Sequence, residues 1–202
     1  MKEKVVAFLK KNWIWSALAF GIPFVVSVII CAAQGIYPFG ENCILHVDMY
    51  HQYCPFFMEM QDKLANGDSF LYSWNLGLGS DFIALYAYYL ASPLNWLLLL
   101  CPSGLVIEFM TITIWIKIAL AGLFFFWYLQ EHFSLKDEKG NFHTNTVLPA
   151  LIFSTAYAFS GFVATYSWNI MWMDSIALAP LIILATSPHP ENGLSCGTRM
   201  PW

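Results

Sequence analysis

Long uncharged stretches separated by short polar ones dominate the chain. Apolar runs occupy 13–33, 106–129, 147–166 and 171–186, and most reach the roughly 20 residues that a helix needs to cross a bilayer. The pattern predicts an all-α polytopic membrane protein with four crossings. An irregular tail is expected at 187–202, where prolines and glycines interrupt the sequence and no apolar periodicity continues.

The charges between these runs predict an orientation. Residues 1–12 contain four lysines, and positive charge next to a membrane span favours the cytoplasmic side. Lys63 is the only basic residue within 34–105, which carries six acidic ones. We therefore expect 1–12 in the cytoplasm, 34–105 as a loop outside, and 130–146 as a cytoplasmic loop.

A surface helix is predicted early in this outside loop. Apolar side chains recur at helical spacing over about 47–66, with polar side chains on the other faces, so the helix is expected to be amphipathic and to lie on the membrane. Asn66, Gly67 and Asp68 are expected to end it. The glycine-containing stretch 73–80 that follows is expected to be a loop.

The uncharged run 82–101 is long enough to span, yet Pro93 and Asn95 lie in its middle. Two interpretations stay open. If the run crosses the membrane, the segment 130–146 moves outside; if it is a re-entrant or interfacial segment, 130–146 stays inside. We prefer the second, because a central proline breaks a spanning helix.

Composition excludes several classes of function. The chain is 58% hydrophobic and 11% charged, whereas soluble domains have roughly 45–50% and about 25%. A net charge of −4 leaves no basic patch for nucleic acid. The five cysteines lack the spacing of a zinc site or a disulfide framework. A Cys43–Cys54 disulfide in the outside loop is the alternative to buried free thiols.

Two groups of polar residues are candidates for chemistry. Asp48, His51 and Gln52 share one side of the predicted surface helix, where Asp48 is a candidate base or, alternatively, a solvated residue or helix cap. Lys117 interrupts the span 106–129, where a cation costs roughly 2.5–3.5 kcal/mol. Asp174 lies about one turn below the predicted exterior turn, so we expect it to pair with Lys117. Binding of a lipid phosphate by Lys117 is the alternative.

The order of several short motifs resembles the YfhO family of bacterial membrane proteins, over about Met1 to Ala185. The motifs are Pro38-Phe39-Gly40, Asp48 with Gln52-Tyr53 and Pro55-Phe56, Ser73-Trp74-Asn75, Gly77-Leu78-Gly79, Tyr88-Tyr89, Ser92-Pro93, Lys117 before Ala121-Gly122-Leu123, Tyr157 before Ser160-Gly161-Phe162, and Asn169 through Trp172, Asp174 and Pro180. Members are several times longer, so the resemblance implies an N-terminal fragment.

The resemblance also implies a fold and an activity. It implies a glycosyltransferase of the GT-C class in the bacterial plasma membrane, with interfacial helices in the first outside loop. Such an enzyme takes a sugar from a polyprenyl-phosphate carrier within the lipid bilayer and passes it to an envelope glycopolymer such as lipoteichoic acid. Asp48 would be the catalytic base or a ligand of a divalent cation. The residues implied in substrate binding are His51, Gln52, Trp74, Tyr88, Tyr89, Lys117, Asn169 and Asp174.

Two other functions compete with this one. In a transporter or flippase, Lys117 and Asp174 would lie on a translocation path, although the chain shows no internal repeat of the kind many transporters have. In a non-catalytic scaffold, the outside loop would only pack against other helices. Turnover of substrate separates a scaffold from an enzyme.

Overall fold

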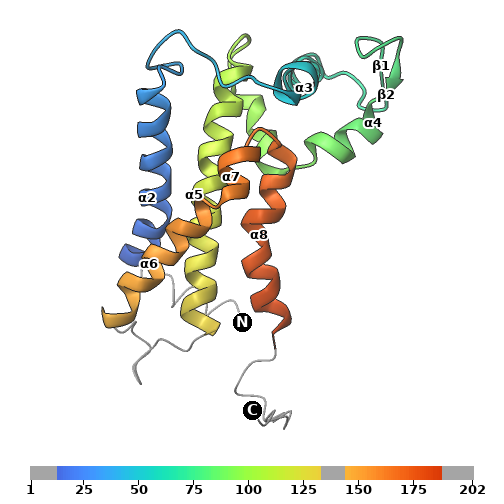
Figure 1. Cartoon of the computed structure of the whole chain (residues 1–202). Coiled ribbons are helices and arrows are strands. Elements are labelled where there is room, and N and C mark those ends of the chain that lie inside the picture. Colours follow the sequence, from blue (N-terminus) through green and yellow to red (C-terminus); the bar gives the residue numbers. More distant parts are fainter. Residues whose placement is uncertain (1–12, 133–143, 188–202) are drawn as a thin grey trace.

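The computed structural model describes residues 13–132 and 144–187, and their helices form an upright bundle with a loop region at one end (Figure 1). The bundle consists of α2 (Trp13–Ala33), α5 (Val106–His132), α6 (Thr144–Ala158) and α8 (Ile170–Thr186). Within these residues, α2, α5 and the stretch Thr146–Tyr166 are long and apolar enough to cross a membrane, and α8 is a shorter apolar helix. The protein is thus an all-α polytopic membrane protein.

Helix α5 is the centre of the bundle and packs against α2, α6 and α8. Its Trp115 indole donates to Cys31 Sγ at 3.2 Å, and its Trp127 indole donates to Ser16 Oγ at 3.0 Å. The early part of α5 therefore lies beside the end of α2, and its late part beside the start of α2. The two helices are antiparallel, so Ala33 and the start of α5 lie at the same end of the bundle, here named the loop end.

Residues 34–105 begin and finish at the loop end. A π-helical turn, η1 (Met49–Tyr53), continues into α3 (Cys54–Asn66), which stops at Gly67 with a φ of 70°. Together they cover the helix predicted at 47–66. The apolar face of α3 is buried against other parts of the protein, however, in a cluster shared with the start of α5 and with 82–100. It faces protein and not lipid because the following segments fold back over it.

The stretch expected to be a simple loop is closed by a small antiparallel hairpin. Its strands are β1 (Tyr72–Ser73) and β2 (Ser80–Asp81), paired Tyr72 with Asp81 and Ser73 with Ser80. Glycines 77 and 79 supply the positive φ angles of the turn, 61° and 102°. Two-residue strands carry no apolar alternation, so the sequence pattern gave no sign of them.

The uncharged run after the hairpin is broken. Its first half comprises α4 (Phe82–Leu85) and η2 (Tyr86–Leu90), its second half is the 3₁₀ helix η3 (Pro93–Leu100), and the halves meet at 108°. Gln61 of α3 donates to the carbonyls of Cys101 and Pro102 at 2.9 and 3.4 Å, which ties the far end of the run to the loop end.

Other helix boundaries differ from the apolar runs. Helix α5 extends to His132, and the run 147–166 begins earlier, at Thr144, and breaks before α7 (Gly161–Tyr166). The break coincides with Ser160-Gly161, since glycine and serine are weak helix formers. The expected segments 1–12 and most of 130–146 and 187–202 lie outside the described residues.

Candidate functional site

A buried ion pair joins α5 and α8 below the loop end. The Lys117 ammonium lies 2.8 Å from Asp174 Oδ2 and donates to the Ile170 carbonyl at 2.9 Å. The Lys117 side chain is 1% exposed and that of Asp174 is 29% exposed. The predicted pairing is confirmed, and it accounts for a cation in an apolar helix because the Asp174 carboxylate and the Ile170 carbonyl both accept hydrogen bonds from Lys117.

Asp174 also forms a hydrogen bond with the residue at the break in the run 82–100. Ser92, which separates η2 from η3, donates its hydroxyl to Asp174 Oδ1 at 3.1 Å. One carboxylate therefore joins three elements: α5 through Lys117, its own helix α8, and the bend at Ser92. The bend is fixed by a polar bond at the point where the backbone turns.

A second contact joins the loop region to the start of α8. The Tyr53 hydroxyl donates to Asn169 Oδ1 at 3.3 Å, and both side chains are buried. The Tyr53 ring meets the Tyr89 ring edge-on at 5.6 Å, and Tyr89 in turn contacts Phe56 and Tyr88 at 5.0 and 4.7 Å. These rings form an aromatic group between α3 and η2, close to the turn before α8.

Asp48 lies beside this aromatic group. It is partly exposed and immediately precedes η1, but its side chain makes no capping hydrogen bond. Burial raises the pKa of Tyr53 above its ordinary value despite a backbone hydrogen bond with Met171, and the nearby Tyr89 and Asp48 groups raise it further. The Asp48 charge therefore acts electrostatically on the Tyr53 hydroxyl, and the Asp48 side chain is not used as a helix cap.

The backbone next to Asp48 is strained. Val47 has a φ of 49°, in the left-handed region that a β-branched residue rarely adopts. Such a conformation costs of order 1–3 kcal/mol and is concentrated at functional sites. The left-handed conformation of Val47 therefore destabilises the backbone at the start of η1.

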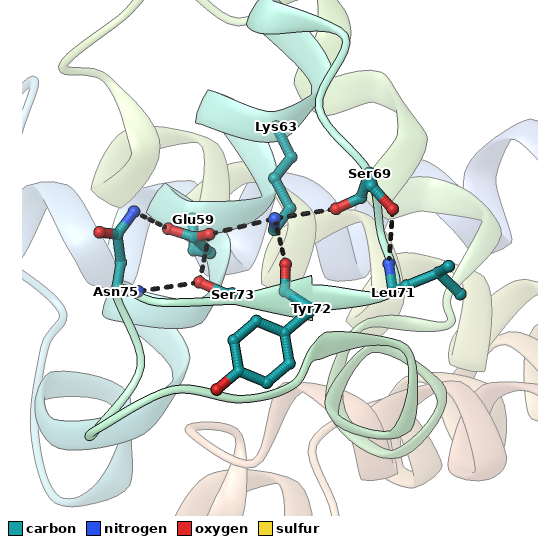
Figure 2. Close-up of polar contacts among 7 residues, drawn as sticks. All are labelled: Glu59, Lys63, Ser69, Leu71, Tyr72, Ser73 and Asn75. Atoms are coloured by element: carbon teal, nitrogen blue, oxygen red, sulfur yellow. Dashed lines mark hydrogen bonds and ion pairs between the residues drawn. The ribbon is translucent and has the colours of Figure 1, made fainter.

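A polar network fastens the hairpin to α3 (Figure 2). Ser73 and Asn75 donate to the two oxygens of Glu59 at 2.5 and 2.9 Å. Lys63 lies 3.5 Å from Glu59 and donates to the backbone carbonyls of Ser69 and Tyr72, both at 2.9 Å. Glu59 and Lys63 are buried, so these bonds hold the hairpin in one position against the helix.

The environment of Glu59 keeps it ionised. Burial raises the pKa of its carboxyl, but the hydrogen bonds from Ser73 and Asn75 and the Lys63 ammonium outweigh burial and lower the pKa below its ordinary value. The charged form is the one that accepts all these bonds, so the network is complete at neutral pH.

The comparison with protein-family models matches residues 19–187 to the family described as bacterial membrane protein YfhO. The chain belongs to the YfhO family. The match includes every candidate residue described above. The comparisons with curated proteins and with solved structures found no match.

In this YfhO-family chain, the predicted site residues divide into three groups. Asp48, Tyr88 and Tyr89 lie around Tyr53, and Asn169 bonds to Tyr53. A second group is the buried pair Lys117–Asp174. The remaining residues lie apart from the pair: His51 is exposed with its ring against Tyr50 at 5.2 Å, Gln52 is half-buried, and Trp74 is on the hairpin against Tyr72 at 4.9 Å.

The described residues contain no group of three or more His, Cys, Asp or Glu side chains placed to share a metal ion. The groups on which the Asp48 charge acts include the Tyr53 and Tyr89 hydroxyls, which are not the carboxylate oxygens that Mg²⁺ prefers. A divalent cation at Asp48 therefore stays a prediction. Cys31, Cys43, Cys54 and Cys101 are free thiols, so the alternative of a Cys43–Cys54 disulfide is wrong.

Four residues that contribute to these contacts were not predicted as site residues from the sequence. Tyr53 lies within the apolar repeat of 47–66, and the signal for its role is that a buried tyrosine hydroxyl usually finds a partner. Glu59 and Lys63 have the i, i+4 spacing of a helical ion pair, and this spacing predicts that their side chains interact. Ser92 stands before a proline in an uncharged run, and only the fold brings it to Asp174.

Proposed function

We propose that this chain carries the reaction centre of a membrane glycosyltransferase, with Asp48 as the base. The enzyme transfers a sugar from a polyprenyl-phosphate donor to an envelope acceptor such as lipoteichoic acid. The observation that supports this most is the Asp48 carboxylate itself, partly exposed, free of a capping bond, and placed at a strained turn beside an aromatic group.

The proposed reaction uses the carboxylate directly. Asp48 accepts the proton of an acceptor hydroxyl, whose oxygen forms a bond to the anomeric carbon of the sugar. The bond between that carbon and the carrier phosphate oxygen breaks, and the phosphate leaves with the bonding electron pair. Tyr88 and Tyr89 offer ring faces and hydroxyls suited to a sugar, which has apolar faces and polar edges.

The other predicted binding residues support this centre in different ways. Asn169 holds Tyr53 in place. For Lys117, the geometry favours pairing with Asp174 over binding of a carrier phosphate, because the ammonium is almost completely buried. His51 and Gln52 lie in η1, just after Asp48, and their proposed role is to bind the acceptor.

The proposed orientation has the loop end outside the bacterial plasma membrane and the N-terminus in the cytoplasm. It rests on the lysines of residues 1–12 and the acidic character of 34–105. Asp62 is exposed on α3, so in a chain whose native cysteines are replaced, a cysteine at this position should react with a membrane-impermeant maleimide in intact cells. Reaction only after the cells are lysed would place the loop end in the cytoplasm and contradict the proposal.

Asp48→Asn tests the catalytic role, with Asp62→Asn as the matched control on the exposed face of the same loop. Each variant is expressed from the protein's own genomic locus, and transfer of labelled sugar from polyprenyl-phosphate sugar is measured in isolated membranes. Loss of a general base is expected to lower the rate about 10²–10⁴-fold. Wild-type transfer by Asp48→Asn at equal expression would exclude the proposal, and movement of the carrier across the membrane without transfer would favour a flippase.

A further inference from the structure

The tip of the hairpin presents large apolar side chains away from the protein. Leu78 is 100% exposed and Trp74 is 78% exposed, while residues 73–80 include no charged side chain. An exposed leucine by itself is unremarkable in a membrane protein. These two stand out because the segment that carries them is held firmly and does not fold back onto the protein.

Three features hold this tip. The Glu59 and Lys63 network fixes both the Tyr72 carbonyl and the Ser73 hydroxyl. Gly79 has a φ of 102°, a conformation that L side chains rarely adopt, and lies against the Tyr72 side chain. The Tyr72 and Trp74 rings then meet edge-on at 4.9 Å. A tip fixed in this way loses little conformational freedom when it binds.

The hairpin is also continuous with an apolar segment of the chain. Strand β2 leads directly into α4, whose first turn is capped by the Asp81 carboxylate. Phe70, just before the hairpin, packs against the rings of Phe82 and Trp96 at 5.4 and 6.2 Å. The broken run 82–100 is long and apolar enough for a membrane segment and exposes leucines such as Leu100.

We propose that the hairpin tip is a membrane-interface anchor in which Trp74 and Leu78 enter the lipid surface beside the bundle. Lipid is the occupant that fits, because tryptophan, tyrosine and leucine without charge are typical of the interface. Figure 1 shows the hairpin next to α4, to one side of the bundle at its loop end. The anchor holds α3, and with it the turn that carries Asp48, at a fixed height over the membrane.

Collision measurements on nitroxide labels test the anchor. The whole chain, with its native cysteines replaced, is labelled at Leu78→Cys and reconstituted in phosphatidylglycerol–phosphatidylethanolamine vesicles. Ile152→Cys on the exposed face of α6 is the lipid reference, and Asp62→Cys on α3 is the water reference. The ratio of oxygen to water-soluble nickel collisions at 78 is expected to rise well above the ratio at 62, towards that at 152. A ratio equal to that at 62 would overturn the proposal.

A second measurement keeps the native cysteines, in case their replacement disturbs folding. A photoreactive benzoylphenylalanine is placed at Leu78 in the otherwise unchanged chain and irradiated in the same vesicles. Lipid adducts identified by mass spectrometry are expected at 78 and absent at 62. Adducts with a second copy of the chain in place of lipid would show a protein contact and contradict the anchor. Neither experiment depends on sugar transfer, so the anchor and the proposed activity can fail separately.

Discussion

Removing the carboxylate of Asp174 should destabilise the bundle more than any other single change to its polar contacts. In Asp174→Leu, the Lys117 ammonium loses its charged partner and keeps only the Ile170 carbonyl at 2.9 Å. The Ser92 hydroxyl at the bend between η2 and η3 loses its acceptor as well. A leucine fills much the same space, so the effect reports the lost polar contacts.

The magnitude follows from the burial of the two partners. Breaking a buried pair by removing one side costs about 3–5 kcal/mol, and Lys117 is 1% exposed. Lys117→Met should cost less, about 1–3 kcal/mol, because Asp174 is 29% exposed and keeps its bond from Ser92. The double variant removes both charges and should be more stable than Asp174→Leu, since apolar residues of similar volume often replace a buried pair without loss.

Unfolding of the purified protein by SDS in mixed micelles, followed by circular dichroism, measures these differences. The expected order of stability is wild type, then Lys117→Met, then Asp174→Leu, with Lys117→Met/Asp174→Leu above Asp174→Leu. If the double variant instead shows the sum of the two single losses, the residues do not act as a pair. Equal stability of Asp174→Leu and wild type would refute the reasoning outright.

Two further predictions concern the hairpin and the helix packing. The pKa of Glu59 is lower in the folded protein than in the unfolded chain. Ionised Glu59 therefore stabilises the fold at any pH above the ordinary glutamate pKa, and this stabilisation is lost as the pH falls through the pKa of the folded state. Hydrogen-exchange protection of 72–81 should therefore persist at the ordinary glutamate pKa and fall below it, and Glu59→Gln should abolish this pH dependence. Gly122→Ala should destabilise the bundle by about 1–3 kcal/mol, because its Cβ would lie 2.9 Å from Pro23. Gly21→Ala, with open space around it, is the control, and an equal thermal-stability loss in both would contradict close packing at Gly122.

The helices of the bundle could be predicted because lipid imposes a simple rule on sequence. A run of about 20 apolar residues has few alternatives to a helix, and α2 covers the same residues as its run. The helix at 47–66 was predictable from its periodicity, yet its apolar face packs on protein and not on lipid. Periodicity identifies a buried face but does not say what covers it, which depends on the contacts of 82–100 and α5.

The candidate site was predictable only in part. The cost of a cation in an apolar span pointed to a partner for Lys117, and Asp174 was the available acid at a suitable depth. Nothing local linked Ser92 to Asp174, because they are 82 residues apart in sequence. The strain at Val47 was equally hidden, since backbone conformation at a single β-branched residue follows from the chain on both sides of it.

Because α2 and α5 are antiparallel neighbours, changes in the loop between them do not alter the membrane topology. Since Ala33 and Val106 lie at the same end of the bundle, residues 34–105 form an insertion between two neighbouring helices. Lengthening, shortening or exchanging this insertion leaves the direction of every later helix unchanged. Changes in the loop therefore leave the order and direction of the helices intact, whereas a single added crossing would invert α5, α6 and α8 together.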